Sequence, residues 1–315
     1  MPEFLLLIFG LVLLTGGAEV LVRGASAIAT RFGISDLVVG LTVVAFGTSA
    51  PELAVSVKAA LAGQGGIAMG NVIGSNIFNV AAILGIAAMV CPLAVHRKVI
   101  RCDMPVMLGV SILFALLLMT GGGLARWEGA VLVAGLAAFT FSTVRLGKSE
   151  TALPEGVVPP PGPAVPAPRL WVSIALVVLG LGLLVLGAQS LVNGAVIIAR
   201  RLGMSEAVIG LTIVAAGTSL PELATSVVAA LRRQTDIAIG NIIGSNIFNV
   251  LGIAGTAALV APINPQGIRG IDIGAMLVTS IVLLPLMKTG FRLVFWEGGA
   301  LLACYAGYLW LVWPK

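Results

Sequence analysis

Long apolar stretches run along the whole chain, separated by short segments that contain charged residues, glycine and proline. A helix needs about 20 apolar residues to cross the hydrocarbon core of a bilayer, and most of these stretches are of that length. We therefore expect ten transmembrane helices. They lie near residues 3–24, 37–61, 67–90, 104–121, 127–146, 170–192, 207–231, 237–260, 272–287 and 292–313.

The segment between the fifth and the sixth stretch has a different character. Residues 147–169, with the sequence GKSETALPEGVVPPPGPAVPAPR, are dense in proline, which suits an extended linker. This linker divides the chain into a first half, residues 1–146, and a second half, residues 170–315. The predicted fold is an all-α polytopic membrane protein with five helices in each half.

The two halves contain an internal repeat. GLTVVAFGTSAPELAVSVKAAL at residues 40–61 returns as GLTIVAAGTSLPELATSVVAAL at residues 210–231, and about 30 of 44 positions are identical between 37–80 and 207–250. Such self-similarity indicates a duplicated unit. Because five is an odd number, the second half enters the membrane from the opposite side. We therefore expect inverted repeats, related by an axis in the membrane plane.

Composition supports a membrane protein and excludes a sizeable soluble domain. The chain has 315 residues, of which 59% are hydrophobic and only 10% charged, and its mean hydropathy is +1.11. The net charge of +5 is spread through short loops without a basic and aromatic cluster, so we expect no nucleic-acid partner. We expect a monomer surrounded by membrane lipid.

Lysine and arginine are distributed unequally between the two sides of the predicted bundle. Twelve of the 18 lie in loops after odd-numbered helices and six lie on the opposite side. Because cytoplasmic loops carry an excess of these residues, both termini are predicted to lie outside and the linker in the cytoplasm. The predicted location is the plasma (inner) membrane.

Each repeat places one carboxylate, Glu52 or Glu222, inside an otherwise apolar stretch. A carboxylate at bilayer depth is costly and is rarely kept without a partner or an ion. Each glutamate directly follows a proline, which removes a backbone donor and interrupts the helix. We expect this interruption to free the carbonyls of Ala45 and Ala215, which must then line a cavity or bind something.

Further oxygen donors accompany these carboxylates. The hydroxyls of Thr48 and Ser49 lie on the same turn as the first glutamate, and Thr218 and Ser219 repeat the arrangement. In the third helix of each half, a serine and an asparagine four residues apart share one face. These residues are Ser75 with Asn79, and Ser245 with Asn249. Four more asparagines are expected to be structural hydrogen-bonders: Asn71, Asn76, Asn241 and Asn246.

The candidate site contains only oxygen donors. Oxygen ligands favour hard cations such as Ca²⁺ and Na⁺ over zinc or copper. Two carboxylates roughly 5 Å apart repel by about 3 kcal/mol at an effective dielectric constant near 20. One divalent cation, two monovalent cations or a proton would relieve the repulsion, so different ions compete for one site. Transported ions are expected, with no resident cofactor.

Two other classes of protein are open to test. A channel would also place oxygen rings at the midplane, but it would more naturally have a continuous pore and oligomeric symmetry. An enzyme is not expected, because Ser49 and Ser219 have no histidine or lysine nearby in the sequence to act as a base. A secondary transporter fits the inverted repeat best.

The paired motifs GTSxPE and GNxxGSNIFN resemble the α-repeats of the sodium/calcium exchanger branch of the cation/calcium antiporter superfamily, prokaryotic type. The resemblance covers the whole chain and implies antiport of Ca²⁺ against Na⁺ by alternating access. It also implies that the first and the sixth helix slide across the core as a gating pair. The ion ligands that it implies are Ala45, Thr48, Ser49, Glu52, Ser75, Asn79, Ala215, Thr218, Ser219, Glu222, Ser245 and Asn249.

One position departs from the family pattern. Many sodium/calcium exchangers carry an aspartate where this chain has Asn249, so the site has two formal charges in place of three. An asparagine still offers a carbonyl oxygen, and coordination survives. The departure leaves the counter-ion open, and Ca²⁺/H⁺ antiport by the same glutamates is the alternative.

Overall fold

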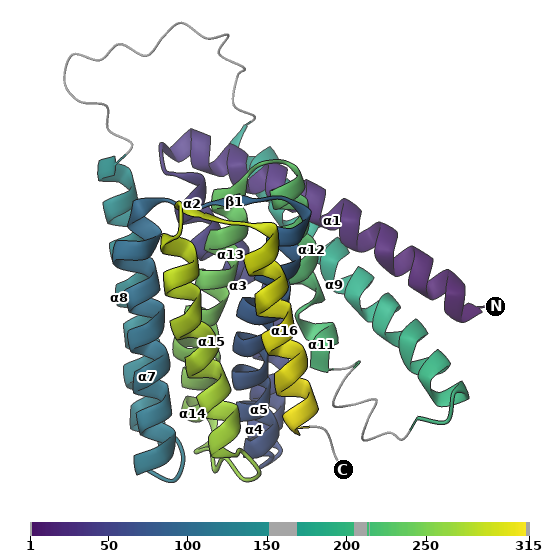
Figure 1. Cartoon of the computed structure of the whole chain (residues 1–315), viewed down its shortest axis with the longest axis vertical. Helices are drawn as coiled ribbons and strands as arrows, with labels where there is room; N and C mark the ends of the chain where they lie inside the picture. Colours follow the sequence, from purple (N-terminus) through teal and green to yellow (C-terminus); the bar gives the residue numbers. More distant parts are fainter. Residues whose placement is uncertain (1, 151–168, 205–212, 214, 313–315) are drawn as a thin grey trace, which may run out of the picture.

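The computed structural model of the chain describes residues 2–150, 169–204, 213 and 215–312. Helices dominate these residues (Figure 1). The first half comprises α1 (Pro2–Phe32), α2 (Asp36–Val39), η1 (Gly40–Val44), α3 (Ala45–Thr48), α4 (Ala50–Leu61), α5 (Gly65–Ile77), η2 (Phe78–Ile83), α6 (Leu84–Val90), η3 (Val99–Asp103), α7 (Met104–Thr120) and α8 (Arg126–Glu150). The second half comprises α9 (Leu170–Arg201), α11 (Ala215–Thr218), α12 (Leu220–Leu231), α13 (Thr235–Phe248), η5 (Asn249–Ala254), α14 (Gly255–Val260), α15 (Gly270–Lys288) and α16 (Phe295–Val312). The η segments are π-helical.

The predicted spans all coincide with helical segments in the described residues. Seven helices are long and apolar enough to cross a membrane, and the bent pair Asp36–Thr48 and Ala50–Leu61 gives an eighth. The chain is therefore an all-α membrane protein with many spans. Of the seventh predicted span, α11 and α12 are described, whereas residues 207–212 lie outside the described part of the chain. Most of the predicted linker, residues 151–168, lies outside it as well.

Several predicted helix ends were wrong. We expected the first helix to end near residue 24 and the sixth near residue 192, but α1 continues to Phe32 and α9 to Arg201. A charged residue such as Arg23 does not stop a helix, and both helices continue by about two turns past their predicted ends. Likewise, α8 continues to Glu150, past the predicted start of the linker at Gly147.

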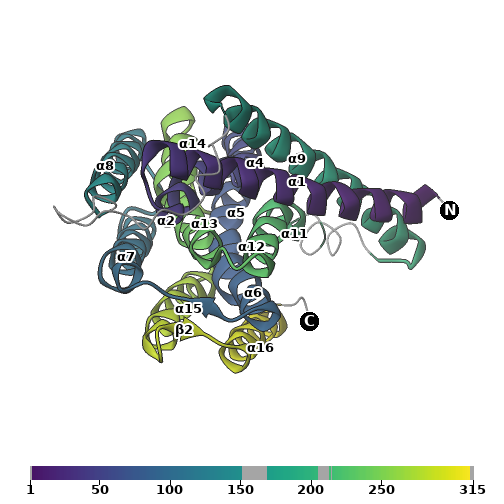
Figure 2. The same ribbon diagram turned by 90° about the horizontal axis from the view of Figure 1, so that it is seen from above.

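Most of the helices form a central bundle. α1 and α9, here called the two-helix unit, lie together obliquely across it (Figures 1 and 2). α5 and α13 occupy the centre, and the segment Thr235–Val260 is almost entirely buried. α7, α8, α15 and α16 surround the centre on two sides, whereas α1 and α9 cross a third side (Figure 2). Two short strands, β1 (Leu93–Ala94) and β2 (Arg292–Leu293), pair antiparallel and tie the two halves together at one end of the bundle.

Glycines allow α1 and α9 to pack very closely. In α1 they recur every seven residues, and a Cβ at Gly17 would lie 2.8 Å from the backbone nitrogen of Leu184 in α9. In return, a Cβ at Gly187 would lie 2.7 Å from the backbone nitrogen of Leu14. Small residues of this kind are typical where transmembrane helices approach backbone to backbone. The positions are Gly10, Gly17, Gly24, Gly180, Gly187 and Gly194.

Replacing Gly17 by alanine should destabilise the protein by about 1–3 kcal/mol, because the new methyl group overpacks a backbone contact. Gly16, one residue earlier, is the matched control, since a Cβ there meets nothing within 4 Å. Gly16→Ala should be neutral or stabilising by up to about 1 kcal/mol, because alanine favours helix more than glycine. Thermal unfolding in detergent measures both. Equal effects of the two substitutions would contradict the close packing of α1 on α9.

The repeated Trp-Glu-Gly sequences at 127–129 and 296–298 mark helix starts. Glu128 accepts a hydrogen bond from the Ala125 backbone N–H at 2.7 Å, and Glu297 accepts one from the Val294 backbone N–H at 2.9 Å. A glutamate in the first turn caps the helix when its side chain accepts a hydrogen bond from the backbone N–H of the residue just before the helix. These two carboxylates therefore have a structural role at the ends of α8 and α16.

Candidate ion-binding site

The second helix of the first half is broken at Ser49. The helical segments Asp36–Thr48 and Ala50–Leu61 meet there at an angle of 47°. Pro51 lies in the first turn of α4, where its missing N–H leaves no helical hydrogen bond unmade. Glu52 follows in the same turn, so the break places the carboxylate in the interior of the bundle. α11 and α12 repeat this arrangement around Ser219, and Glu222 lies in the first turn of α12.

The backbone at the first break differs from the sequence-based expectation. We expected the Ala45 carbonyl to lose its helical partner, and this was wrong, because it accepts a hydrogen bond from the Ser49 N–H at 3.1 Å. Pro51 lacks only the N–H that would bond to the Gly47 carbonyl, four residues before it, so the bond to Ala45 is kept. In the second repeat the Ser219 N–H donates instead to the Ala216 carbonyl, at 3.2 Å. A role of the Ala215 carbonyl stays a prediction.

Each glutamate is held by a serine of the other repeat. The Ser219 hydroxyl donates to Glu52 Oε1 at 2.8 Å, and the Ser49 hydroxyl donates to Glu222 Oε1 at 2.7 Å. Both carboxylates are 1% exposed. The second oxygen of each, Oε2, is buried and has no hydrogen-bond partner in the described residues. The two carboxylates therefore meet where the repeats face each other, and each keeps one oxygen available.

More hydroxyls join the repeats around this centre. Ser49 Oγ lies 3.1 Å from Ser245 Oγ, and Ser219 Oγ lies 3.4 Å from Ser75 Oγ. The Thr48 hydroxyl lies 3.2 Å from Asn241 Oδ1 and is buried, whereas Thr218 is half-buried. The structure thus brings the predicted threonines, serines and glutamates of both repeats into one cluster, of which all members but Thr218 are buried.

Asn79 is the second residue of the π-helical segment η2, and Asn249 is the first residue of η5. Their amide nitrogens donate across the repeat boundary, Asn79 to Asn246 Oδ1 at 3.0 Å and Asn249 to Asn76 Oδ1 at 2.9 Å. The oxygens of both amides are buried and have no partner in the described part of the chain. A π-helical turn often marks a functional position in a helix. Both amides therefore have the same free atom, a carbonyl oxygen.

Four buried oxygens in this cluster thus have no hydrogen-bond partner among the described residues: Glu52 Oε2, Glu222 Oε2, Asn79 Oδ1 and Asn249 Oδ1. Buried polar atoms are normally satisfied, and unsatisfied ones call for an explanation such as an ion. Carboxylate and amide oxygens are ligands that Ca²⁺ accepts. The donor set carries two negative charges and suits a hard cation.

Sequence reasoning missed how the remaining asparagines act. Asn71 donates to the Glu52 backbone carbonyl at 3.1 Å, and Asn241 donates to that of Glu222 at 3.4 Å, which ties the third helix of each half to the second. The bonds of Asn76 and Asn246 to the opposite repeat were not expected. The motif GSN could have drawn attention to them, because each asparagine directly follows a predicted ligand serine. The motif does not indicate, however, which residues of the opposite repeat lie next to these asparagines.

The two-helix unit covers the repeats unequally. α1 packs along α12, whereas α9 makes no comparable contact with α4, the equivalent segment of the first repeat. Thr225 of α12 is consequently fully buried, and its counterpart Val55 of α4 is 38% exposed. Glu19 of α1 also pairs with Arg232, directly after α12. The structure is therefore asymmetric, with one side of the candidate site covered.

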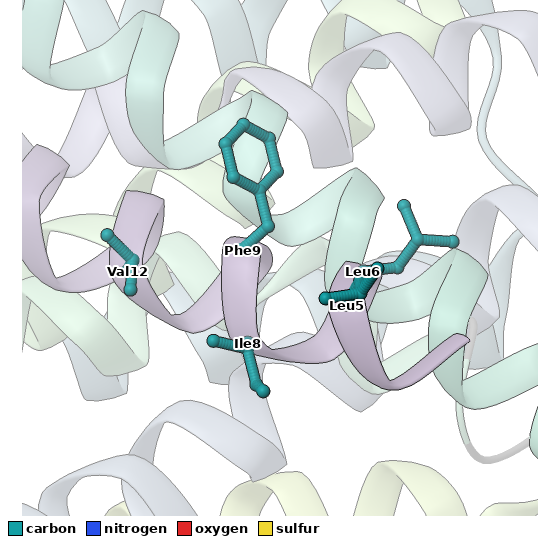
Figure 3. A pocket seen from close by; sticks show the side chains of 5 residues that line it. All are labelled: Leu5, Leu6, Ile8, Phe9 and Val12. Atoms are coloured by element: carbon teal, nitrogen blue, oxygen red, sulfur yellow. The ribbon is translucent and has the colours of Figure 1, made fainter. Parts of the chain in front are cut away.

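An apolar hollow, lined by none of the residues of this cluster, lies on the N-terminal half of α1 (Figure 3). Its lining consists of Leu5, Leu6, Ile8, Phe9 and Val12. It offers almost no polar surface, so it suits contact with lipid tails and has no features of an ion site.

Two inverted five-helix repeats, each with a broken helix whose carboxylate reaches the common centre, define a secondary transporter. A family model described as "Sodium/calcium exchanger protein" matches residues 3–144 and again residues 172–313. The chain belongs to the sodium/calcium exchanger family and is a cation/Ca²⁺ antiporter, not an enzyme.

Three similar proteins span nearly the whole chain. The inner membrane protein YrbG of Escherichia coli (strain K12) is 39% identical over 88% of this chain and 86% of its own. The sodium/calcium exchanger MaX1 of Methanosarcina acetivorans is 33% identical over 98% of this chain and 97% of its own. A solved structure of the sodium-calcium exchanger NCX_Mj, soaked with 10 mM Na⁺ and 10 mM Sr²⁺, has a TM-score of 0.85 at 30% identity and covers 100% of this chain and 99% of that chain.

Proposed function

We propose that the chain exchanges Ca²⁺ for Na⁺ across the membrane by alternating access. The observation that carries the proposal is the pair of buried glutamates, each bonded through one oxygen to a serine of the opposite repeat and with the other oxygen unpartnered. MaX1 is named a sodium/calcium exchanger, which supports the same ion pair. One Ca²⁺ or two Na⁺ neutralise the two carboxylates, so the two ions compete for one site.

The proposed ligands are the side chains that meet at this centre. The glutamates and the amide oxygens bind Ca²⁺, and the hydroxyls with the backbone carbonyls of Ala45 and Ala215 complete the Na⁺ sites. Hydroxyl and carbonyl oxygens carry no formal charge, which suits a monovalent ion. The proposed set is Ala45, Thr48, Ser49, Glu52, Ser75, Asn79, Ala215, Thr218, Ser219, Glu222, Ser245 and Asn249.

The asymmetric cover supports alternating access. With both termini outside, the end of α12 faces the cytoplasm and the end of α4 faces the outside. α1 packs on α12, so this conformation is closed toward the cytoplasm. Movement of α1 and α9 toward α4 would close the other side. The name of the relative YrbG supports placement in the inner membrane. All proposed ligands come from one chain, which supports a monomer.

Ca²⁺/H⁺ antiport is the second candidate. It is favoured by the asparagine at position 249, which removes a charge, and by the presence of only two carboxylates, each able to take a proton. A proton neutralises a carboxylate without needing further ligands. We prefer Na⁺, because the relatives MaX1 and NCX_Mj are both named sodium/calcium exchangers.

A Na⁺ gradient should drive Ca²⁺ uptake into proteoliposomes, and a pH gradient alone should not. The purified full chain is reconstituted in vesicles loaded with Na⁺, diluted into Na⁺-free buffer, and compared with vesicles that carry only a pH gradient. We expect uptake at least about tenfold above that of empty vesicles only in the first case. The converse result would select Ca²⁺/H⁺ antiport.

The same vesicles test the channel alternative. A vesicle with neither gradient but with a membrane potential, set by K⁺ and valinomycin, reports uncoupled Ca²⁺ flux. An exchanger should show almost none without a counter-ion. Rapid Ca²⁺ entry under this condition would contradict the antiport proposal.

A further inference from the structure

Four asparagines form two crosswise pairs at the proposed site. Asn79 donates to Asn246, and Asn249 donates to Asn76, so that each pair joins one repeat to the other. All four are at most 2% exposed. Asn79 and Asn249 keep an unpartnered oxygen in the described structure, whereas Asn76 and Asn246 have theirs occupied as acceptors. The two members of each pair therefore have different roles.

The orientation of a ligand amide decides whether it can bind a cation. The two ends of the group have nearly the same shape, but the oxygen accepts a cation and the NH₂ group carries partial positive charge. A half-turn of the amide would replace a favourable ligand with a repulsive one, at little steric cost. Something in the surroundings must therefore select the productive orientation.

Asn246 is oriented by groups that can only accept hydrogen bonds. Its Nδ2 lies 3.4 Å from the backbone carbonyl oxygen of Asn76 and 3.7 Å from the sulfur of Met107. Because neither group donates, the NH₂ of Asn246 must point toward them and its oxygen toward Asn79. Asn79 must then donate its own NH₂ to that oxygen, and its carbonyl oxygen is left for the ion.

The amide of Asn76 in the other pair is oriented in the same way, but by a sulfur atom alone. Asn76 Nδ2 lies 3.8 Å from the sulfur of Met276, and its oxygen accepts from Asn249. Met276 and Met107 occupy equivalent places, each four residues after the aspartate that begins the fourth helix of its half. The two methionines, the two orienting asparagines and the two ligand amides thus obey the pseudo-two-fold symmetry of the repeats.

We propose that Asn76 and Asn246 are positioning residues, each of which turns the ligand amide of the opposite repeat so that its carbonyl oxygen faces the ion. The inference rests on the proposed cation site and deepens it. Neither residue contacts the ion in the proposed site. Each acts through Asn249 or Asn79, in the way that outer partners orient the ligands of other metal sites.

Replacing Asn76 by leucine should weaken Ca²⁺ binding by about 10–100-fold, the usual effect of losing such an orienting partner. Leucine has the same branched shape and the same number of side-chain heavy atoms but accepts no hydrogen bond, so the Asn249 amide is free to turn its NH₂ toward the ion. Binding is measured with radioactive Ca²⁺ on the full chain in lipid nanodiscs. The control is Ser111→Ala, because the Ser111 hydroxyl is also buried but bonds only to the Met107 carbonyl of its own helix, at 2.8 Å.

A double-mutant cycle separates positioning from simple damage. In an Asn249→Asp background the ligand is a carboxylate, which offers an oxygen in either orientation and needs no orienting acceptor. Adding Asn76→Leu to Asn249→Asp should therefore weaken binding by less than about 3-fold, so the two substitutions are strongly coupled. Asn246→Leu with Asn79→Asp provides a second, independent cycle should the first variant fold poorly.

Equal weakening by Asn76→Leu in both backgrounds, or wild-type affinity of Asn76→Leu and Asn246→Leu, would overturn the inference while leaving the proposed function intact. A wild-type chain that binds no Ca²⁺ in the same assay would contradict the proposed function itself, and the inference with it. The two failures are therefore distinguished by the wild-type measurement.

Discussion

Substitution of Glu52 or of Glu222 by glutamine is expected to reduce Na⁺-driven Ca²⁺ uptake by about 100-fold or more, because the number of charged ligands is a main determinant of Ca²⁺ affinity. The two carboxylates are the only formal charges in the cluster described above. Loss of one halves the negative charge that a divalent cation meets in a buried site. A tenfold loss of affinity corresponds to about 1.4 kcal/mol, so the expected effect is near 3 kcal/mol.

The two substitutions should have similar effects, because each glutamate is held in the same way. A glutamine at either position can still accept the hydrogen bond from the serine of the opposite repeat, at the place where Ser219 or Ser49 now donates. Its NH₂ group would then take the position of the unpartnered carboxylate oxygen. The substitution removes the charge and presents a donor to the ion, while the fold-stabilising bond is kept.

Uptake of radioactive Ca²⁺ into proteoliposomes measures this effect, and Glu128→Gln is the matched control. Glu128 caps the start of α8 through the Ala125 N–H, and glutamine can serve in the same position of a capping box. This variant should transport at a rate close to that of the wild type. Normal transport by Glu52→Gln or Glu222→Gln would remove that residue from the proposed site.

Much of this architecture could be predicted from the sequence, because the membrane and the backbone impose strong requirements on apolar residues and on proline. The length of the apolar stretches identified the spans, because a helix needs a minimum number of apolar residues to cross the hydrocarbon core of a bilayer. The proline before each glutamate identified the helix breaks, because the first turn of a new helix accommodates a proline without the loss of a hydrogen bond. The approach of Glu52 to Glu222 followed from the duplication and from the odd number of helices in each half.

Other features depend on tertiary contacts that no short motif encodes. The Ala45 carbonyl was expected to be free, but Pro51 removes only the bond to Gly47, and the Ser49 N–H still bonds to Ala45. The π-helical segments η1, η2 and η5 were not expected. η1 lies against α13, where a Cβ at Gly244 would be only 2.5 Å from the Leu41 carbonyl oxygen. Such a close approach is a property of the folded pair and not of either helix.

The crosswise asparagines illustrate the same limit. Asn76 directly follows Ser75, so it lies about 100° away from the ligand face of its helix, which agrees with the structural role predicted for it. Its partner Asn249 is 173 residues away in the chain. Only the fold shows that an asparagine off the ligand face of one repeat is adjacent to the ligand face of the other.

Cross-linking α1 to the end of α12 is expected to arrest transport almost completely. In the described conformation Glu19 of α1 pairs with Arg232, and alternating access requires α1 to leave α12. A chain with cysteines in place of Glu19 and Arg232, and with the native Cys91, Cys102 and Cys304 replaced by serine, can be bridged by a short bifunctional thiosulfonate. Ca²⁺ uptake should fall to the level of empty vesicles and recover when the bridge is reduced.

The matched control places the same bridge within the two-helix unit. Glu3 of α1 pairs with Arg201 of α9, so cysteines at these two positions join helices that the glycine contacts already hold together. If α1 and α9 move as one body, this bridge constrains no motion that transport requires, and uptake should persist at more than about half of the unbridged rate. Ca²⁺ binding to both bridged proteins in nanodiscs separates arrested movement from a damaged site. Full transport with the α1–α12 bridge in place would contradict movement of this unit against α12, and arrest by both bridges would show that α1 and α9 must also move relative to each other.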